Sequence, residues 1–355
     1  MPFRRTALAA ALLLASLAGC TSDSTVAPPD NPAPSHTWEA LDLTDGYAEA
    51  FALAEHDGAL VAGGDFFGAA GSPHATQVRF TGSGWQLLGP QSNSDVYVLA
   101  AHDGRLVAGG HFTKVGSDSL AYIAAWDGTA WRDLGGGMDW NVFALAEYGG
   151  DLVAAGVFLD AGGARVNRIA RWDGSAWHPL GPGLDDAVWA LAVYRGELIA
   201  GGSFRAAGAT GASFVAAWNG ANWRPLGNDL DLNGTVRALI VHNDTLYAGG
   251  SFATAAGRPA MHVACWNGAA WDSVGAGLGR YASEGVHSFT VYKDHVVAGG
   301  AFLGGVAEWK AGLWFPVGTL FGDVGALAVH GGRLYAGGLV GTSPDRSLGV
   351  VRWVE

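Results

Sequence analysis

The sequence predicts an all-β fold: a seven-bladed β-propeller of four-stranded antiparallel blades, closed into a ring by an N-terminal strand that completes the last blade. Three observations lead to this prediction. One unit recurs seven times, tryptophan recurs at two fixed places in that unit, and the last unit ends one strand short. Repeats of this length that contain four short strands are typical of propeller blades.

The repeat is marked by a pair of small residues at the end of an apolar segment. Successive pairs are spaced by 46, 46, 46, 48, 50 and 38 residues. Because one sheet of four short strands cannot bury both of its faces, each unit must stack on its neighbours. The pairs are Gly63-Gly64, Gly109-Gly110, Ala155-Gly156, Gly201-Gly202, Gly249-Gly250, Gly299-Gly300 and Gly337-Gly338.

Each unit contains four predicted strands in a fixed order. In the fourth unit the first strand spans 188–193 and the second spans 198–204. In the third unit the third strand spans 169–172 and the fourth spans 177–181. Asp-Gly and Asn-Gly turns recur before the fourth strand, and such dipeptides between apolar segments are the strongest short-range hairpin signal.

Tryptophan is regular in the repeat. Thirteen of the 15 tryptophans occupy the third- and fourth-strand positions, and we interpret them as packing residues between blades. They are Trp38, Trp85, Trp126, Trp131, Trp172, Trp177, Trp218, Trp223, Trp266, Trp271, Trp309, Trp314 and Trp353.

The two ends of the repeat region predict how the ring closes. The last unit stops at 353–355 with its third strand and without a fourth. Ahead of the first complete unit, residues 37–41 (T-W-E-A-L) match the missing W-x-x-L strand. Pairing the two would leave no open sheet edge, and we expect a monomer.

The Gly-Gly doublet, followed by an aromatic residue and then a tryptophan, resembles the kelch repeat of galactose-oxidase-type propellers over about residues 37–355. The resemblance implies the propeller fold and does not imply a function. One feature departs from it, because the aromatic pair is spaced W-x-x-x-x-W, as in Trp172 and Trp177, one residue tighter than the usual kelch spacing.

The N-terminus predicts export and anchoring. Residues 1–19 combine Arg4 and Arg5 with a short apolar run, as in a signal peptide. The segment ends L-A-G before Cys20, which resembles the bacterial lipobox, and the resemblance implies that Cys20 is lipidated. Residues 20–35, rich in Pro and Ser, then form a flexible tether, and the propeller spans 36–355.

The predicted location follows from the same segment. In the lipoprotein pattern an Asp after the cysteine would favour the inner membrane, so Thr21 favours the outer membrane or cell surface. The alternative is an ordinary secretory signal. The formal net charge of −12 argues against a nucleic-acid partner, because phosphates require clusters of Lys and Arg.

A candidate binding notch lies at the sixth unit. The segment from the Gly-Gly pair to the third-strand aromatic residue is 16 residues in the first five units but 9 here, from Gly300 to Trp309. The preceding link is the longest in the chain and carries polar groups. We expect a notch for a ligand or partner between the missing loop and the long link, at Arg280, Tyr281, Glu284 and His287.

A weaker candidate is a calcium site in the link before the fifth unit. Asp229, Asp231 and Asn233 resemble the start of a D-x-D-x-N-G calcium loop. The twelfth position is Ile240 and supplies no bidentate carboxylate. No other cofactor is expected, and four histidines at one turn position of four different units are too dispersed to share an ion.

Function is the least determined property. We expect a non-catalytic binding or scaffold propeller on an envelope membrane, with a protein or a glycan as partner. The alternatives are a glycan hydrolase or lyase and a structural envelope component. Convergent carboxylates or histidines at the channel mouth would favour an enzyme, whereas the many Ala and Gly residues in the loops favour a flat, inert face.

Overall fold

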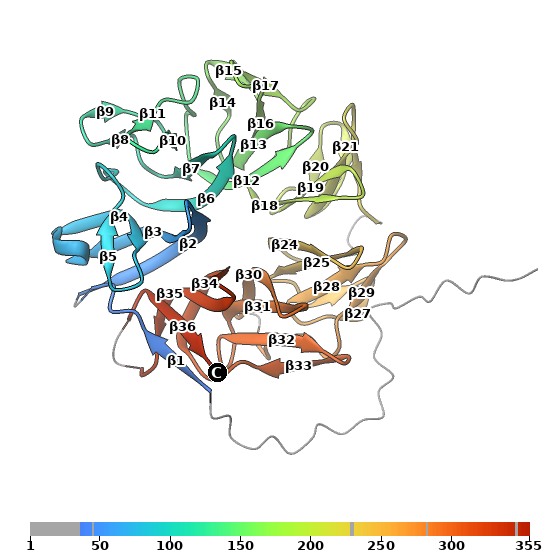
Figure 1. The fold of residues 1–355 in the computed structure, drawn as a ribbon. Helices are drawn as coiled ribbons and strands as arrows, with labels where there is room; N and C mark the ends of the chain where they lie inside the picture. The colour runs from blue at the N-terminus through green and yellow to red at the C-terminus, as the bar shows by residue number, and fades with distance from the viewer. Residues whose placement is uncertain (1–35, 45, 228–230, 282, 345–346) are drawn as a thin grey trace, which may run out of the picture.

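The computed structural model describes residues 36–44, 46–227, 231–281, 283–344 and 347–355. The predicted signal peptide, Cys20, the tether and Asp229 lie outside these residues. The described chain forms seven four-stranded antiparallel sheets arranged around one axis (Figure 1), and this confirms the seven-bladed propeller.

The blades follow one another along the chain, and within each blade the strands run in order from the innermost to the outermost. Blades one to three are β2 (Ala48–His56), β3 (Ala59–Phe67), β4 (His74–Phe80), β5 (Trp85–Leu87); β6 (Val96–His102), β7 (Arg105–Gly110), β10 (Ile123–Trp126), β11 (Trp131–Arg132); and β12 (Val142–Tyr148), β13 (Asp151–Gly156), β16 (Ile169–Trp172), β17 (Trp177–Pro179). Blades four and five are β18 (Val188–Tyr194), β19 (Glu197–Gly202), β22 (Val215–Trp218), β23 (Trp223–Pro225); and β24 (Val236–His242), β25 (Thr245–Gly250), β28 (Val263–Trp266), β29 (Trp271–Ser273). Blades six and seven are β30 (Gly285–Tyr292), β31 (His295–Ala301), β32 (Val306–Lys310), β33 (Leu313–Pro316); and β34 (Phe321–His330), β35 (Arg333–Gly341), β36 (Val350–Val354), β1 (Thr37–Ala40).

The two faces of the ring differ. On one, the turn face, tight turns join the first strand to the second and the third to the fourth. On the other, the loop face, lie the longer second-to-third-strand loops and the links between blades. In blades two to five each long loop folds into a small hairpin: β8–β9 (Lys114–Val115, Asp118–Ser119), β14–β15 (Asp160–Ala161, Ala164–Arg165), β20–β21 (Ala206–Ala207, Thr210–Gly211) and β26–β27 (Thr254–Ala255, Arg258–Pro259). Blade one carries the 3-10 turn η1 (Ala69–Gly71), and in blade six only residues 302–305 separate β31 from β32.

The fourth-strand tryptophan connects each blade to the one before it. Its indole Nε1 donates a hydrogen bond to a backbone carbonyl of the preceding blade's final strand segment, over 2.7 to 3.1 Å. The same bond occurs seven times around the ring. The pairs are Trp85–Leu41, Trp131–Leu88, Trp177–Leu134, Trp223–Leu180, Trp271–Leu226, Trp314–Val274 and Trp38–Val317.

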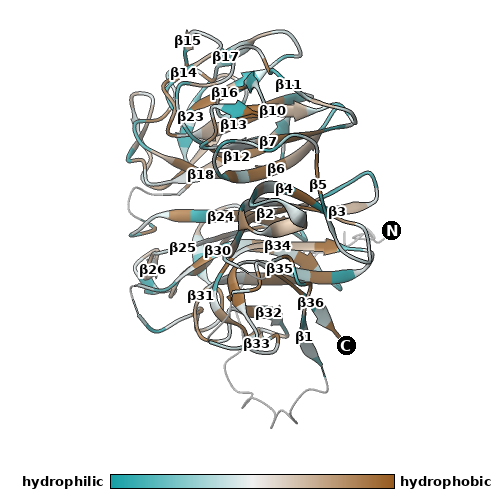
Figure 2. Ribbon diagram, turned by 90° about the vertical axis from the view of Figure 1, so that its left-hand side faces the viewer, coloured by the Kyte–Doolittle hydropathy of each residue, from teal (hydrophilic) through white to brown (hydrophobic). Residues whose placement is uncertain are grey.

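Each W-x-x-L-G strand ends in glycine because the third-strand tryptophan of the next blade packs against that position. A Cβ on Gly135 would lie 2.2 Å from Trp172 of the next blade, and one on Gly89 would lie 2.4 Å from Trp126. Within a blade the third- and fourth-strand rings then pack at 50° in the Trp172–Trp177 pair, with centroids 5.4 Å apart. The pairs therefore fill the space between blades, as predicted. Seen from the side, apolar residues (brown) recur on the strands of successive blades (Figure 2).

The ring closes as predicted. Strand β1 pairs antiparallel with β36, with Thr37 opposite Val354 and Glu39 opposite Arg352, and the last two side chains form an ion pair. The blue N-terminal strand lies against the red C-terminal one in Figure 1. Trp38, only 7% exposed, donates to Val317 across 279 residues of sequence.

Both ends of the described chain lie at the turn face. The side chain of Glu355 accepts a hydrogen bond from the Tyr292 hydroxyl at 3.0 Å and pairs with Lys293, in the first turn of blade six. Thr37 begins β1 beside Val354, at the end of β36. The polypeptide therefore enters the ring at the face opposite the long loops. Among the described residues, no helix has the length and apolar character needed to cross a membrane.

Truncation of the closing tryptophan tests this architecture. Trp38→Ala removes a buried side chain and its indole hydrogen bond, so the free energy of unfolding should fall by about 3–5 kcal/mol. Chemical denaturation monitored by circular dichroism measures the loss. Trp140→Ala is the matched control, because Trp140 is 52% exposed and lies outside the packing positions, and it should cost less than about 1 kcal/mol. Equal losses in the two variants would contradict closure through Trp38.

Candidate functional site at the channel mouth

The innermost strand of every blade contains a β-bulge near its start, on the loop-face side. The second glycine of each small-residue pair marks the bulge in the sequence. A Cβ at this glycine would lie 2.0–2.1 Å from the carbonyl oxygen of the residue two positions before the bulged one, so no larger residue fits. A bulge leaves one residue out of the ladder and redirects its side chain. The bulged residues, from blade one to blade seven, are Phe51, Tyr97, Phe143, Trp189, Arg237, His287 and Gly325.

All seven of these residues line one cavity of about 450 Å³ at the loop-face end of the central channel, which we call the channel mouth. The other lining residues are Glu49, Asn141, Asp323 and Gly338. A cavity of this size, with aromatic walls and a few polar groups, has the composition of a ligand site. The repeating backbone therefore holds seven residues of six different types at one structural position.

Aromatic side chains form one wall of the channel mouth, which we call the aromatic wall. Phe51 meets Tyr97 edge-on, with ring centroids 5.3 Å apart, and Tyr97 packs on Phe143 at 5.6 Å. Phe143 stacks on Trp189 at 4.2 Å with an interplanar angle of 16°. The wall thus continues through blades one to four, and each ring restrains the next.

Arg237 continues the wall as a cation. Its guanidinium lies over the Trp189 ring, 5.2 Å from the centroid, so that Trp189 is held between Phe143 and Arg237. The Trp189 indole Nε1 donates to Ser203 Oγ at 3.0 Å and fixes the ring plane. A stacked guanidinium keeps the donors in its own plane available for a ligand.

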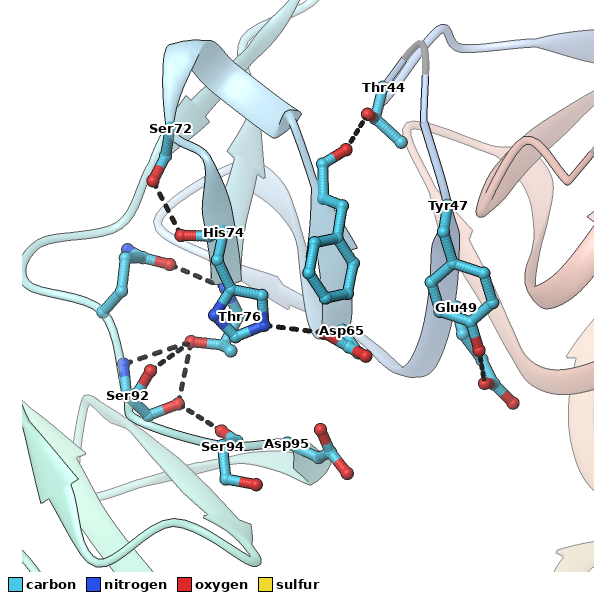
Figure 3. A network of polar contacts seen from close by, with 12 residues as sticks. Thr44, Tyr47, Glu49, Asp65, Ser72, His74, Thr76, Ser92, Ser94 and Asp95 are labelled. Carbon is cyan, nitrogen blue, oxygen red and sulfur yellow. Dashed lines mark hydrogen bonds and ion pairs between the residues drawn. The ribbon is translucent and has the colours of Figure 1, made fainter.

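Two carboxylates face the cavity from blades one and seven. Glu49 accepts a hydrogen bond from the Tyr47 hydroxyl, and nearby Asp65 is bonded to His74 at 2.7 Å (Figure 3). Asp323 lies 2.8 Å from His287 Nδ1. Each lining carboxylate thus has one protein partner and keeps further lone pairs for a ligand.

The tyrosines of this region act as hydrogen-bond donors at neutral pH. Burial, followed by the neighbouring Asp95 carboxylate, raises the pKa of Tyr97 to about 12. The hydrogen bond to Glu49 is the main cause that raises the pKa of Tyr47 to about 12. Both hydroxyls therefore stay protonated and donate, Tyr97 to Asp95 at 3.1 Å and Tyr47 to Glu49.

Asn141 adds an unsatisfied acceptor to the site. It lines the cavity, and its Oδ1 is buried and lacks a hydrogen-bond partner within the described chain. An unsatisfied buried polar atom costs about 1–3 kcal/mol.

The channel mouth was not predicted from the sequence. The Ala- and Gly-rich loops favoured a flat face, whereas the structure has a cavity with carboxylates, a histidine and aromatic rings. One readable signal pointed to it: two of the 15 tryptophans, Trp140 and Trp189, fall outside the packing positions. Trp189 lines the cavity, and Trp140, in the link to blade three, is half exposed and stacks with Tyr122 at 6.3 Å.

The predicted notch residues divide into two groups. Arg280, Tyr281 and Glu284 form a turn in the link to blade six, in which Glu284 Oε2 accepts the backbone N–H groups of the other two. These hydrogen bonds hold the pKa of Glu284 below its ordinary value, so its carboxylate is ionised at neutral pH. His287 lies instead in β30 and faces the channel mouth. The structure therefore does not join the four side chains into one site.

A second cavity lies where the blade-six loop is short. It has a volume of about 530 Å³ and is mainly apolar, with Leu278, Phe302, Leu303 and Trp314 among its lining residues. Leu303 is 88% exposed. The missing loop thus leaves a depression, as its length suggested, although none of the predicted polar residues lines it.

Of the calcium candidates, Asp231 and Asn233 are described. Asn233 Oδ1 accepts the backbone N–H groups of Ala253 and Thr254, at 2.8 and 2.9 Å. Asn93, Asp139 and Asp185 make the same pair of bonds in blades two to four. The position therefore has a structural role, namely fixing the long loop of each blade, and calcium binding there stays a prediction.

The turn-face histidines pair with different neighbours. His102 Nδ1 lies 3.2 Å from Glu147 of the next blade, and His330 Nδ1 lies 3.0 Å from Glu55. The ligand atoms of His102, Asp103 and Glu147 lie within 4.8 Å of one another. Both carboxylates are exposed, and the His102–Glu147 contact between blades has a counterpart in the His330–Glu55 pair.

Comparison with known proteins shows the fold. No protein-family model matches the chain, and no curated protein matches it. Among solved structures, the extracellular domain of a putative hybrid two-component system from B. thetaiotaomicron aligns with a TM-score of 0.59 and 9% identity, covering 89% of this chain and 39% of that one. This chain therefore spans well under half of the length of that extracellular domain.

WD40 propellers match over nearly their whole length. The RRP9 WD40 repeats align with a TM-score of 0.57 and 16% identity, covering 91% of this chain and 98% of that one. The WD40 propeller domain of Doa1 gives 0.55 and 11%, covering 89% and 96%. Identities this low show the propeller fold alone, and the kelch resemblance stays a prediction.

Proposed function

We propose that this chain is an extracytoplasmic lipoprotein whose propeller binds a protein or glycan partner, without catalysis, at the channel mouth. The observation that carries the proposal is the contrast at the inner strands. Backbone, glycine pairs and tryptophans repeat around the ring, whereas the seven bulged positions carry six different residue types and line a cavity of about 450 Å³. A specific binding site requires varied side chains on a rigid support. Here the repeated framework is the support, and the side chains that line the cavity vary.

The position of the chain ends supports this orientation. The chain enters β1 at the turn face, so a lipidated Cys20 would hold the turn face toward the membrane. The 16 residues of 20–35 could span up to about 55 Å when extended. The loop face, with the channel mouth, would then point away from the membrane and be open to partners.

Removal of the acylated cysteine tests the anchor. Acyl chains contribute about 0.8 kcal/mol of membrane affinity per buried CH₂, so Cys20→Ala should move the protein from the membrane pellet to the soluble fraction. Cell fractionation and immunoblotting measure the distribution. Thr21→Ser is the control and should stay with the membrane. Membrane retention of Cys20→Ala would refute lipid anchoring.

Partner capture tests the location of the site. Tagged full-length protein is incubated with envelope extract, and the retained protein and glycan species are quantified by mass spectrometry. Trp189→Ala should reduce specific capture at least tenfold, because it removes the ring on which both Phe143 and Arg237 pack. Val193→Ala, on the same strand but near the turn face and 40% exposed, is the matched control and should capture normally.

A second variant distinguishes the two loop-face locations. Replacement of residues 278–288 by a short Gly-Ser link removes the notch turn together with His287. If capture is lost in this variant but kept in both Trp189→Ala and His287→Ala, the partner binds at the notch, and the channel mouth is the wrong site. Circular dichroism confirms that each variant is folded.

One observation favours a second candidate, a glycan-active enzyme. His287 and Asp323 form a hydrogen-bonded pair at 2.8 Å that faces the same cavity as Glu49. Such a pair can orient a histidine for general acid or base work. Release of new reducing ends or unsaturated products from a bound glycan, abolished by His287→Ala, would support this reading over a purely binding role.

A further inference from the structure

Arg237 is one of several arginines of the described chain without a carboxylate partner, and of these it is the one that lines the channel mouth. Seven others form ion pairs with carboxylates. Arg237 is exposed and contacts the Trp189 ring, but among the described residues it has no hydrogen-bond or ion-pair partner. In a chain with 32 acidic and 20 basic residues, a guanidinium without a carboxylate beside it is a candidate for binding an anion.

The Arg237 guanidinium is also held in place. Trp189 beneath it is fixed on its other face by Phe143 and at its indole nitrogen by Ser203. Ser203 Oγ in turn lies 3.2 Å from Thr235 Oγ1, on the strand segment that leads to Arg237. A preorganised donor loses less entropy when a ligand binds. The planar donor fork of arginine matches the two oxygens of a carboxylate.

The acceptors of the channel mouth lie elsewhere on its circumference. In a seven-membered ring, blade five with Arg237 stands across the axis from blades one and two. Glu49 projects from blade one, Asp323 from the adjacent blade seven, and the Asn141 side chain from blade three. These groups require hydrogen-bond donors from a ligand, and they are spread over three blades.

The aromatic wall lies between Arg237 and Glu49. Its rings, from Phe51 to Trp189, follow blades one to four between the carboxylate of Glu49 and the cation of Arg237. The apolar surface that these rings leave open to the cavity can pack against the C–H groups of a sugar ring. The site thus offers an anion acceptor, an apolar wall and several separate hydrogen-bond acceptors in one cavity.

We infer that the channel mouth binds a carboxylated sugar residue of an acidic glycan, with its carboxylate on Arg237, its ring against the aromatic wall and its hydroxyls on Glu49, Asp323 and Asn141. This inference rests on the proposed binding function of the same site. It assigns the ligand class, which the proposed function leaves open between protein and glycan.

The distribution of charge favours this ligand over two others. A site for a single ammonium group would have its carboxylates close to one another. Here the acceptors are spread over three blades, an arrangement that suits the hydroxyls around a sugar ring. A phosphate monoester carries close to two negative charges at neutral pH, more than one permanent cation balances in a cavity that also holds Glu49 and Asp323. A sulfate ester carries one charge, as a carboxylate does, and the binding experiment below separates these two groups. A carboxylate matches one guanidinium in charge and in bidentate geometry.

Glycan binding by the purified full-length protein tests the inference. The probes are immobilised oligosaccharides of four kinds: oligogalacturonate, hyaluronan and sialyl-lactose as carboxylated sugars; methyl-esterified oligogalacturonate and lactose as neutral ones; chitosan oligomers; and a sulfated galactan. Binding should be confined to carboxylated probes, and esterification should weaken it at least tenfold. Arg237→Gln should weaken it at least tenfold as well.

Arg205→Gln is the matched control, because Arg205 also lies over an aromatic ring, 4.6 Å from the Phe214 centroid, but does not line the channel mouth. It should bind the carboxylated probes like the unmodified protein. Asn141→Ala should weaken binding without altering the preference for a carboxylate, since it removes one hydroxyl acceptor.

The possible failures are distinguishable. Binding that ignores the carboxylate or Arg237 but is lost in Trp189→Ala would overturn the acidic sugar and keep the channel mouth as the site. If no carboxylated probe bound and a protein partner were captured in a Trp189-dependent way, the acidic sugar would again be wrong and the channel mouth would again be the site. If neither glycan binding nor partner capture depended on Trp189, the inference and the channel-mouth location would both fail.

Discussion

The hydrogen bond from a fourth-strand indole to the preceding blade is the interaction on which the rest of this structure depends. It recurs seven times with nearly constant length, and each copy fixes one blade on its neighbour at the outer edge of the ring. Six copies join segments 40 to 45 residues apart, and the seventh joins Trp38 to Val317. Closure is therefore the same local contact made once between the two ends of the chain.

This outer constraint leaves the inner strands free to vary. The Gly-Gly pair lets the backbone of each first strand bulge toward the axis, and it does so whatever side chain occupies the bulge. Phe143, Arg237 and Gly325 stand at the same position in three blades. Stability and recognition are thus carried by different residues, which allows the channel mouth to be specific although the framework is repetitive.

Most of the framework was predictable from the sequence, because its signals are local and repeated. The Trp172–Trp177 spacing, the hairpin turns and the match of residues 37–41 to a missing strand determined the blade count and the closure. The channel mouth was not predictable, because strict strand alternation does not reveal a bulge, so Phe51 or Arg237 could not be assigned to the axis. Sequence proximity also misled, since His287 follows Glu284 closely but only His287 lines the channel mouth.

The most direct test of the account is a cross-link across the closing pair. Glu39 and Arg352 lie opposite each other on β1 and β36, so a Glu39→Cys/Arg352→Cys variant should form a disulfide on mild oxidation, identified by mass spectrometry of the linked peptides, and should unfold at a higher temperature than its reduced form. A Glu39→Cys/Arg132→Cys variant, which joins blade seven to blade two, should form none. Failure of the first pair to cross-link in folded protein would contradict closure of the ring by the N-terminal strand.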